Sequence, residues 1–296
     1  MDITDCVGNT PLVYLNRISR ILGAHIFMKL ECRNPSGSIQ DRLALACIRK
    51  AERVGRMNGP RCFVEAVDAY FGLSLALLGM KHDLRFLFCT PEYTDRWALG
   101  LMKELGAEII LTPSEDGFAG AMSKAAYHRK DTWGSFRPEV FESTDLADYY
   151  YDEAGAELVK DLSLQHIKPD AFICGVWSGN AITGIGRRLR TVNPTIQIVA
   201  VEPAESPVLS GGTAGKHRIT GIGSGCIPQA LDKSLISEVV TVKEEEAMGA
   251  VRRLHCMEGI LAGPSSGANL FAALKLACKD EWKGRNIISV ASDSWR

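Results

Sequence analysis

Short, nearly continuous apolar runs alternate with amphipathic helical patterns along most of the chain, and this alternation constrains the fold most strongly. Such runs have no polar face to turn toward water, which is typical of strands in a parallel sheet that helices cover on both faces. Parallel strands need a crossover, usually a helix, so the alternation predicts βαβ units and an α/β fold with mostly parallel, twisted sheets. The expected strands are residues 26–30, 62–65, 85–89, 108–111, 171–174, 197–201 and 286–290. The expected helices lie near residues 39–54, 72–81, 96–105, 118–129, 152–162, 182–190, 244–257 and 267–279.

A looser stretch, residues 131–144, interrupts this pattern. It contains Trp133-Gly134 and Arg137-Pro138 and few periodic apolar positions, which indicates a crossing between domains. The chain has 296 residues, enough for one large or two ordinary domains of roughly 100–200 residues each.

Charge and hydropathy exclude several classes of protein. The chain has 34 Lys and Arg residues against 35 Asp and Glu residues, so it has no basic bias toward nucleic acid or anionic membranes. No apolar run approaches the roughly 20 residues of a membrane-spanning helix. The start, Met1 to Asp5, lacks the basic and apolar segments of a signal peptide. We expect a cytoplasmic protein that has neither nucleic acid nor a membrane as partner.

Cysteine and histidine spacing gives no sign of a metal centre. The nine cysteines are scattered without a CxxC pair, and most lie in apolar segments, which favours buried, reduced thiols over disulfides or a zinc site. The six histidines show no ligand-pair spacing. We therefore expect no metal.

Two glycine-bearing loops and one serine-rich segment are candidates for ligand binding. Residues 263–267 match the nucleophile elbow GxSxG, but no histidine follows Ser265 to complete a hydrolase triad. We interpret this segment as a helix start whose hydroxyl and N–H groups cap the helix or hold a polar ligand edge. Residues 221–225 form one glycine loop, and residues 175–180 lie between an expected strand and an expected helix, as in many phosphate sites. The bulky Trp177 leaves phosphate binding open on loop chemistry alone.

Several segments, in the same order along the chain, carry a resemblance that covers essentially all of it. They are GNTPLV at 8–13, KLE at 29–31, NPSGSIQDR at 34–42, GIG at 221–223, Pro228, Leu231-Asp232 and GPSSG at 263–267. With them the chain resembles the cysteine synthase (O-acetylserine sulfhydrylase) and cystathionine β-synthase family, fold-type II enzymes that use pyridoxal 5′-phosphate (PLP). The resemblance implies the tryptophan synthase β-like fold, a cofactor cleft between two α/β domains, and a homodimer. We expect a smaller domain at 38–140 and a larger one at 1–37 and 141–296.

Gln40 is the first departure from the family pattern. The family has a lysine at this position, and that lysine forms the Schiff base with PLP. A carboxamide has no amine with which to form an imine or take the α-proton of a substrate. Lys29 lies on an expected strand and matches a different family lysine, so it is no obvious substitute.

The second departure lies in the loop that grips the substrate carboxylate in the family. The family's TSGNTG corresponds to VDAYFG at residues 67–72, which brings in Asp68, Tyr70 and Phe71. The carboxylate of Asp68 would repel the carboxylate of an amino acid.

The third departure is in the family's phosphate loop, GTGGT, which corresponds to WSGNA at residues 177–181. Ser178 and Gly179 keep the pattern, whereas Trp177 and Asn180 replace glycines. A single laboratory substitution at position 40 would not explain these other two altered loops.

The retained residues describe a degenerate PLP site, in which Ser265 matches the serine that meets the pyridine nitrogen. Because the imine and two loop glycines are lost, we expect no cofactor, with PLP absent or bound only weakly and without a covalent link. The candidate cofactor-binding residues are Ser178, Gly179, Gly221, Gly223 and Ser265.

Three functions stay open, and we favour a non-catalytic homologue. It would bind a small amino-acid-like ligand or a protein tail in the old cleft, as cysteine synthases bind the C-terminal tail of serine acetyltransferase. Tyr70, Phe71 and Trp177 would fill the volume of PLP, and plain core packing explains them equally well. The second function is PLP-independent chemistry, and the third is residual, non-covalent PLP binding. The candidate catalytic residues, which offer acid, phenol and amide groups, are Gln40, Asp68, Tyr70 and Asn180.

Overall fold

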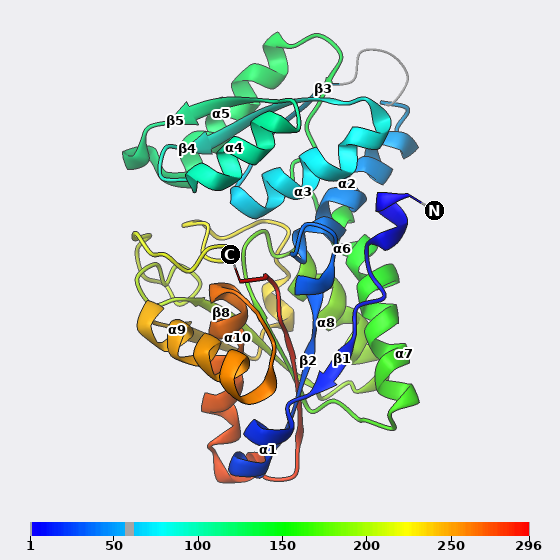
Figure 1. The fold of residues 1–296 in the computed structure, drawn as a ribbon, viewed down its shortest axis with the longest axis vertical. Coiled ribbons are helices and arrows are strands. Elements are labelled where there is room, and N and C mark those ends of the chain that lie inside the picture. The colour runs from blue at the N-terminus through cyan, green and yellow to red at the C-terminus, as the bar shows by residue number, and fades with distance from the viewer. Residues whose placement is uncertain (1, 57–61, 296) are drawn as a thin grey trace. The chain divides into compact units, whose positions relative to one another are not determined.

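A computed structural model describes residues 2–56 and 62–295, and the chain divides into two compact units (Figure 1). The smaller unit comprises Met1–Val7 and Gln40–Ser143, and the larger comprises Gly8–Ile39 and Thr144–Arg296. Asp2 forms an ion pair of 2.6 Å with Lys81, so the N-terminal residues group with the smaller unit, whereas the sequence analysis placed them with the larger. Each unit is built on its own sheet, and the expected α/β fold with two mostly parallel sheets is confirmed.

The larger unit has, among the described residues, a six-stranded sheet in the order β1-β2-β10-β7-β8-β9. β1 runs antiparallel to β2, and the other neighbours are parallel. β10 therefore joins the N-terminal pair of strands to the βαβ units that follow. The strands are β1 (Leu12–Tyr14), β2 (His25–Lys29), β7 (Ala171–Gly175), β8 (Gln197–Pro203), β9 (Glu238–Val242) and β10 (Asn286–Val290).

Helices bury both faces of this sheet. α9 and α10 pack against each other, and together with α1 they cover one apolar cluster that includes Ile26, Ile173 and Leu270 (Figure 1). α8 lies against β7 and β8. Pro264 occupies the first turn of α10, where its missing N–H costs nothing. The helices of this unit are α1 (Asn16–Leu22), α6 (Asp145–Tyr150), α7 (Ala156–Leu164), α8 (Asn180–Val192), α9 (Glu244–Arg253) and α10 (Pro264–Ala277), with π-helical turns η5 (Tyr151–Gly155) and η7 (Leu254–Glu258).

The smaller unit is a four-stranded parallel sheet in the order β5-β4-β3-β6 among the described residues. Phenylalanine side chains fill its core, with the Phe63 ring 5.2 Å from Phe136 and 6.1 Å from Phe86 between centroids. α5 packs against β3 and β4 (Figure 1). The strands are β3 (Cys62–Ala66), β4 (Arg85–Pro91), β5 (Ala107–Thr112) and β6 (Ser135–Phe136), and the helices are α2 (Gln40–Arg53), α3 (Ala69–Gly79), α4 (Arg96–Glu104) and α5 (Gly117–Asp131).

Short 3-10 turns connect these elements. Asp2 caps the first of them through its side chain, and Asp232 caps η6 in the same way. They are η1 (Ile3–Cys6), η2 (Glu31–Arg33), η3 (Met80–His82), η4 (Ser114–Asp116), η6 (Lys233–Leu235) and η8 (Asp280–Trp282).

No helix of the part that the structure describes is long and apolar enough to cross a membrane. All nine cysteines are free thiols, and they differ in exposure. Five are buried, which agrees with their apolar sequence surroundings: Cys32, Cys47, Cys62, Cys89 and Cys174.

Candidate functional site

The two units divide the candidate site residues between them. Gln40, Asp68 and Tyr70 belong to the smaller unit. The larger unit holds Asn180 and the candidate cofactor-binding residues Ser178, Gly179, Gly221, Gly223 and Ser265.

The loop between β7 and α8 ends in a left-handed glycine. Gly179 has φ of 83°, and a Cβ there would lie 2.9 Å from the backbone nitrogen of Leu231, so only glycine fits. Next to it, the Asn180 amide donates a hydrogen bond of 3.1 Å to the Ser178 hydroxyl. The first turn of α8 contains no acidic residue, so the positive end of this helix dipole suits an anion.

The second glycine loop closes onto the first. The backbone N–H of Gly223 donates to the carbonyl of Val176 at 2.8 Å, and the Ser224 hydroxyl donates to the carbonyl of Trp177 at 3.3 Å. A His217 ring nitrogen lies 2.8 Å from the carbonyl oxygen of Gly223. The two loops that the sequence singled out therefore form one local structure.

The start of α10 lies close to these loops. A Cβ at Gly175 would come within 3.3 Å of the Asn269 side-chain oxygen, one turn along α10 from Ser265. The hydroxyl of Ser265 is fully buried and has no hydrogen-bond partner among the described residues. Because a buried hydroxyl without a partner is costly, this atom is suited to meet a ligand.

Asp68 caps α3 in the smaller unit. Its Oδ1 accepts a hydrogen bond of 2.7 Å from the backbone N–H of Phe71, while its Oδ2 is buried without a hydrogen-bond partner among the described residues. Burial raises the pKa of the Asp68 carboxyl to about 6, and backbone hydrogen bonds from Phe71 and Tyr70 counteract part of this effect. Asp68, expected from the sequence to face a ligand, is thus the N-cap of α3, a role that an Asp directly before a helix can signal.

Gln40 is the first residue of α2 and is buried. Tyr70 and Phe71 are likewise buried in the first turn of α3. The sequence analysis began that helix at residue 72, so it placed these aromatic residues in a loop. Their burial agrees with core packing at least as well as with ligand contact.

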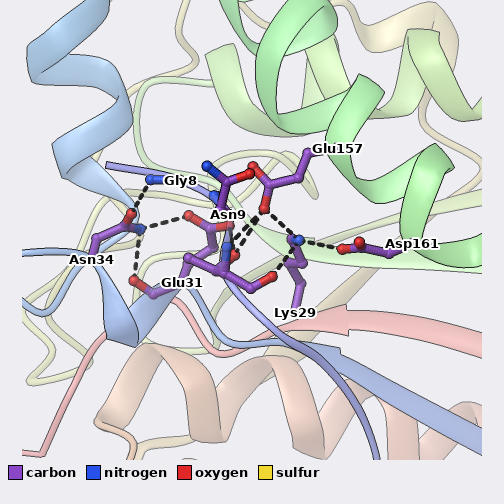
Figure 2. A network of polar contacts seen from close by, with 8 residues as sticks. Gly8, Asn9, Lys29, Glu31, Asn34, Glu157 and Asp161 are labelled. Carbon is purple, nitrogen blue, oxygen red and sulfur yellow. Dashed lines mark hydrogen bonds and ion pairs between the residues drawn. The ribbon is translucent and has the colours of Figure 1, made fainter. Parts of the chain in front are cut away.

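Lys29 is held in a dense polar network in the larger unit (Figure 2). Its ammonium lies 2.6 Å from each of three oxygens: the carbonyl of Thr10, a carboxylate oxygen of Glu157 and a carboxylate oxygen of Asp161. Glu157 also accepts backbone N–H groups of Asn9 at 2.9 Å and Thr10 at 2.8 Å. The amine of Lys29 is thus engaged by three oxygens within the larger unit, and the residue lies on β2, a strand that was expected from the sequence.

The same network fixes the segment that precedes Gln40. The Asn34 side chain accepts the N–H of Gly8 at 2.8 Å and donates to Glu31 at 2.7 Å (Figure 2). Thr10 donates its hydroxyl to the same Glu31 carboxylate at 2.7 Å. Residues of three family-like segments, Gly8 and Thr10, Glu31, and Asn34, therefore meet within the larger unit.

Two features of the larger unit suit the binding of PLP. The partnerless Ser265 hydroxyl matches the group that the resemblance assigns to the pyridine nitrogen, and the acid-free start of α8 suits the phosphate. Trp177 and Asn180, which the resemblance aligns with family glycines, are both buried beside the second feature. The residues of the larger unit fit the cofactor at these two places.

Two residues of this region escaped the sequence analysis. Asp293 accepts the backbone N–H groups of Ser265 and Ser266, and Asn269 keeps one side-chain oxygen without a partner among the described residues. Asp293 is far from α10 in the sequence, so no local pattern could have shown that it caps this helix.

Comparison with known proteins gives a consistent result. A family model described as "Pyridoxal-phosphate dependent enzyme" matches residues 3–293. A cysteine synthase of Staphylococcus aureus is 38% identical over 289 residues, which are 98% of this chain and 92% of the relative. The structure is similar to a hydrogen sulfide-producing enzyme from Fusobacterium nucleatum, with a TM-score of 0.93, 34% identity and coverage of 99% and 97% of the two chains. It is also similar to an O-acetylserine dependent cystathionine beta-synthase from Helicobacter pylori, with a TM-score of 0.92, 32% identity and coverage of 99% and 95%.

These relatives overturn one expectation. The sequence analysis expected no cofactor, because Gln40 and the altered phosphate loop remove contacts. That expectation is wrong: the matching family is defined by its dependence on PLP, and membership implies PLP binding. By sequence and by structure, this chain belongs to the pyridoxal-phosphate dependent enzyme family, among relatives that include the cysteine synthases.

Proposed function

We propose that this chain is a PLP-binding, cysteine-synthase-like protein that does not synthesise cysteine and instead binds a small ligand or a protein tail. The observation that carries the proposal is Gln40 within NPSGSIQDR, which the resemblance aligns with the family's Schiff-base lysine. Fold and family membership do not guarantee the family's reaction when the reacting group is replaced.

Three residues of the larger unit would hold the cofactor, and a fourth would support their loop. Ser265 would bind the ring nitrogen, and Ser178 and Gly179 at the start of α8 would bind the phosphate, with Gly223 bracing this loop through Val176. When bound, PLP supplies an electron sink for carbanion chemistry on amino acids.

Gln40 cannot replace the lysine in that chemistry. Its carboxamide donates and accepts hydrogen bonds, but it has no amine that adds to an aldehyde and no basic nitrogen that takes a proton at neutral pH. Lys29 is no substitute, because its ammonium is surrounded by the oxygens of Thr10, Glu157 and Asp161.

Asp68 gives the second line of support. The loop that the resemblance assigns to the substrate carboxylate carries its own carboxylate here, which accepts the Phe71 N–H at 2.7 Å. A helix N-terminus that already holds one negative group binds a second with less gain, because the two charges repel. For an amino-acid substrate, the site therefore lacks the lysine amine that reacts in the family and binds the substrate carboxylate less favourably.

A sulfhydrylase assay tests the loss of activity. The chain, loaded with PLP, is incubated with O-acetylserine and sulfide beside the Staphylococcus aureus cysteine synthase as positive control. We expect no cysteine above the level that free PLP produces. Cysteine formation at a rate within a hundredfold of the control would overturn the proposal.

A thermal shift experiment tests the binding role. A peptide with the C-terminal sequence of a serine acetyltransferase, O-acetylserine and cysteine are added separately, and the melting temperature is recorded. The same ligands are tested on Tyr70→Phe, which alters a buried candidate residue, and on Tyr127→Phe, which alters an exposed tyrosine. We expect a shift that Tyr70→Phe reduces and Tyr127→Phe preserves, and no shift with any ligand would contradict the binding role.

A second candidate function is proton transfer by Asp68. Its Oδ2 is buried without a hydrogen-bond partner among the described residues, and burial raises the pKa of the carboxyl to about 6, close to the operating pH of a general acid or base. An activity that depends on Asp68 would follow a pH profile with an apparent pKa near 6 and would disappear in Asp68→Asn.

A further inference from the structure

Asp293 joins the C-terminal segment to the first turn of α10. Its backbone carbonyl accepts the N–H of Gly263 at 2.8 Å, and its carboxylate accepts the N–H groups of Ser266 at 2.9 Å and Ser265 at 3.2 Å. The Ser266 hydroxyl donates to the same carboxylate at 2.5 Å. Asp293 thus caps α10 from a distant part of the sequence.

The approach of this carboxylate depends on a glycine. A Cβ at Gly263 would lie 2.5 Å from Oδ2 of Asp293, which is closer than real contacts allow. Asp293 is 1% exposed, and burial raises the pKa of its carboxyl while hydrogen bonds from Ser266 and Ser265 counteract that effect. Both oxygens of the side chain are engaged at the helix start.

The backbone N–H of Ser265 is bound by Asp293, whereas its side-chain hydroxyl makes no such hydrogen bond to any described residue. The hydroxyl oxygen is buried without a hydrogen-bond partner in the part of the chain that the structure describes. One turn further, Asn269 donates to the carbonyl of Val290 at 2.9 Å and to the Ser292 hydroxyl at 3.0 Å. The end of β10 and the start of α10 therefore form a fixed frame that presents one unused hydroxyl.

We propose that Asp293 is a positioning residue, which holds Ser265 in the orientation that binds the ring nitrogen of PLP. This role rests on the proposed placement of PLP against Ser265. Asp293 acts through Ser265, because its own oxygens accept the hydrogen bonds of the helix start.

The charge of Asp293 also makes the N-terminal end of α10 differ from the N-terminal end of α8. A carboxylate at the start of α10 offsets the positive end of the helix dipole, so this end suits a neutral acceptor such as a ring nitrogen. The first turn of α8 carries no acid and suits the phosphate. The cap therefore favours one orientation of bound PLP, with its ring nitrogen at α10 and its phosphate at α8.

A double-mutant cycle tests whether Asp293 acts through Ser265. PLP is titrated into the unaltered chain, Asp293→Asn, Ser265→Ala and the double variant, and the dissociation constant is read from the absorbance of bound PLP. Loss of one hydrogen bond to the cofactor in Ser265→Ala should weaken binding about tenfold. We expect Asp293→Asn to weaken binding about fivefold when Ser265 is present and less than about twofold in the Ser265→Ala background.

Gly263→Ala is a second variant, in which neither Asp293 nor Ser265 is itself substituted. The added methyl group would lie 2.5 Å from the Asp293 carboxylate and 2.8 Å from the carbonyl oxygen of Ser294, so both must shift and PLP binding should weaken at least as much as in Asp293→Asn. Gly249→Ala is its control, because a Cβ there meets only the end of the Arg252 side chain at 3.9 Å. Asp280→Asn controls for loss of a carboxylate, since the Asp280 side chain is 90% exposed.

Two results would overturn the proposal. Equal losses from Asp293→Asn with and without the Ser265 hydroxyl would show a general structural role, as would a lower melting temperature with unchanged PLP affinity. Failure of the unaltered chain to bind PLP would also overturn it. Cysteine synthase activity in the unaltered chain would contradict the proposed function, yet it would leave the cycle and its result intact.

Discussion

The carboxylate of Asp68 accepts a hydrogen bond of 2.7 Å from the backbone N–H of Phe71, so α3 carries its own acidic cap. Asparagine caps a helix as well as aspartate does, whereas alanine cannot accept the hydrogen bond. We expect Asp68→Ala to be less stable than Asp68→Asn by about 1 kcal/mol. Neither variant carries the charge of Asp68, so urea denaturation of both at neutral pH measures the contribution of the capping hydrogen bond. Equal stabilities would contradict the role of this side chain as a helix cap.

The pH dependence of stability should report the buried charge of Asp68. Burial raises the folded pKa of Asp68 from its ordinary value of 3.8 to about 6, so the folded state binds the proton more tightly than the unfolded state. The stabilisation from this group is therefore complete below about pH 4 and is lost as the pH rises through 6. Relative to Asp68→Asn, the native chain should lose up to about 3 kcal/mol between pH 4 and pH 7. Denaturation curves at four pH values check the sign, which would be opposite if the carboxylate were stabilised.

Restoring the lysine alone should not restore the synthase. Gln40→Lys returns the amine, but Asp68 still places a carboxylate at the start of α3. We expect no cysteine formation from Gln40→Lys and detectable formation from Gln40→Lys combined with Asp68→Ser. Activity in the single variant would show that the loop change matters little, and binding of PLP to each variant serves as the control for folding.

The Lys29 network should be sensitive to removal of its cation. Lys29→Met leaves Glu157 and Asp161 without their shared partner, and breaking such a buried pair costs about 3–5 kcal/mol. We expect the lower end of this range, because the Asp161 side chain is 25% exposed. Asp161→Asn, which keeps Glu157 as partner, should cost clearly less, and equal losses in the two variants would contradict the network.

Trp177 should act as a packing residue. Its side chain is 6% exposed in the loop between β7 and α8, so Trp177→Ala leaves a large cavity and should cost about 3–5 kcal/mol. Trp133→Ala is the matched control, because Trp133 is 82% exposed and its loss should change stability little. Calorimetry of the two variants measures the difference.

The central strands were predictable because burial on both faces leaves a continuous apolar run. Residues 286–290 were expected as a strand and are β10, with neighbours on both sides. β9 was missed, because it lies at the sheet edge and is only partly buried, so its sequence shows no such run. β6 has two residues, Ser135–Phe136, within the stretch interpreted as a crossing, and a strand this short leaves no period to detect.

The candidate site was predictable only where motif residues act locally. The glycine loops and Ser265 were expected from the resemblance, and the structure gives the loop contact between Gly223 and Val176. The cap that Asp293 supplies to α10 joins residues far apart in the sequence, and no periodic pattern encodes such a contact. The expectation that no cofactor binds failed for a different reason: it rested on three altered contacts, whereas the family match spans residues 3–293 and implies PLP binding.

The position of β10 in the sheet has a consequence for synthesis of the chain on the ribosome. β10 lies between β2 and β7, so the strands made before it form two separate groups, β1-β2 and β7-β8-β9, with no ladder between them. Residues 40–143 of the smaller unit are continuous in the sequence and emerge long before β10. The smaller unit can therefore fold during translation, whereas the larger sheet closes only after residues 286–290 have left the exit tunnel. Until then, the facing edges of β2 and β7 are unpaired, and their free N–H and C=O groups are open to pairing with other strands.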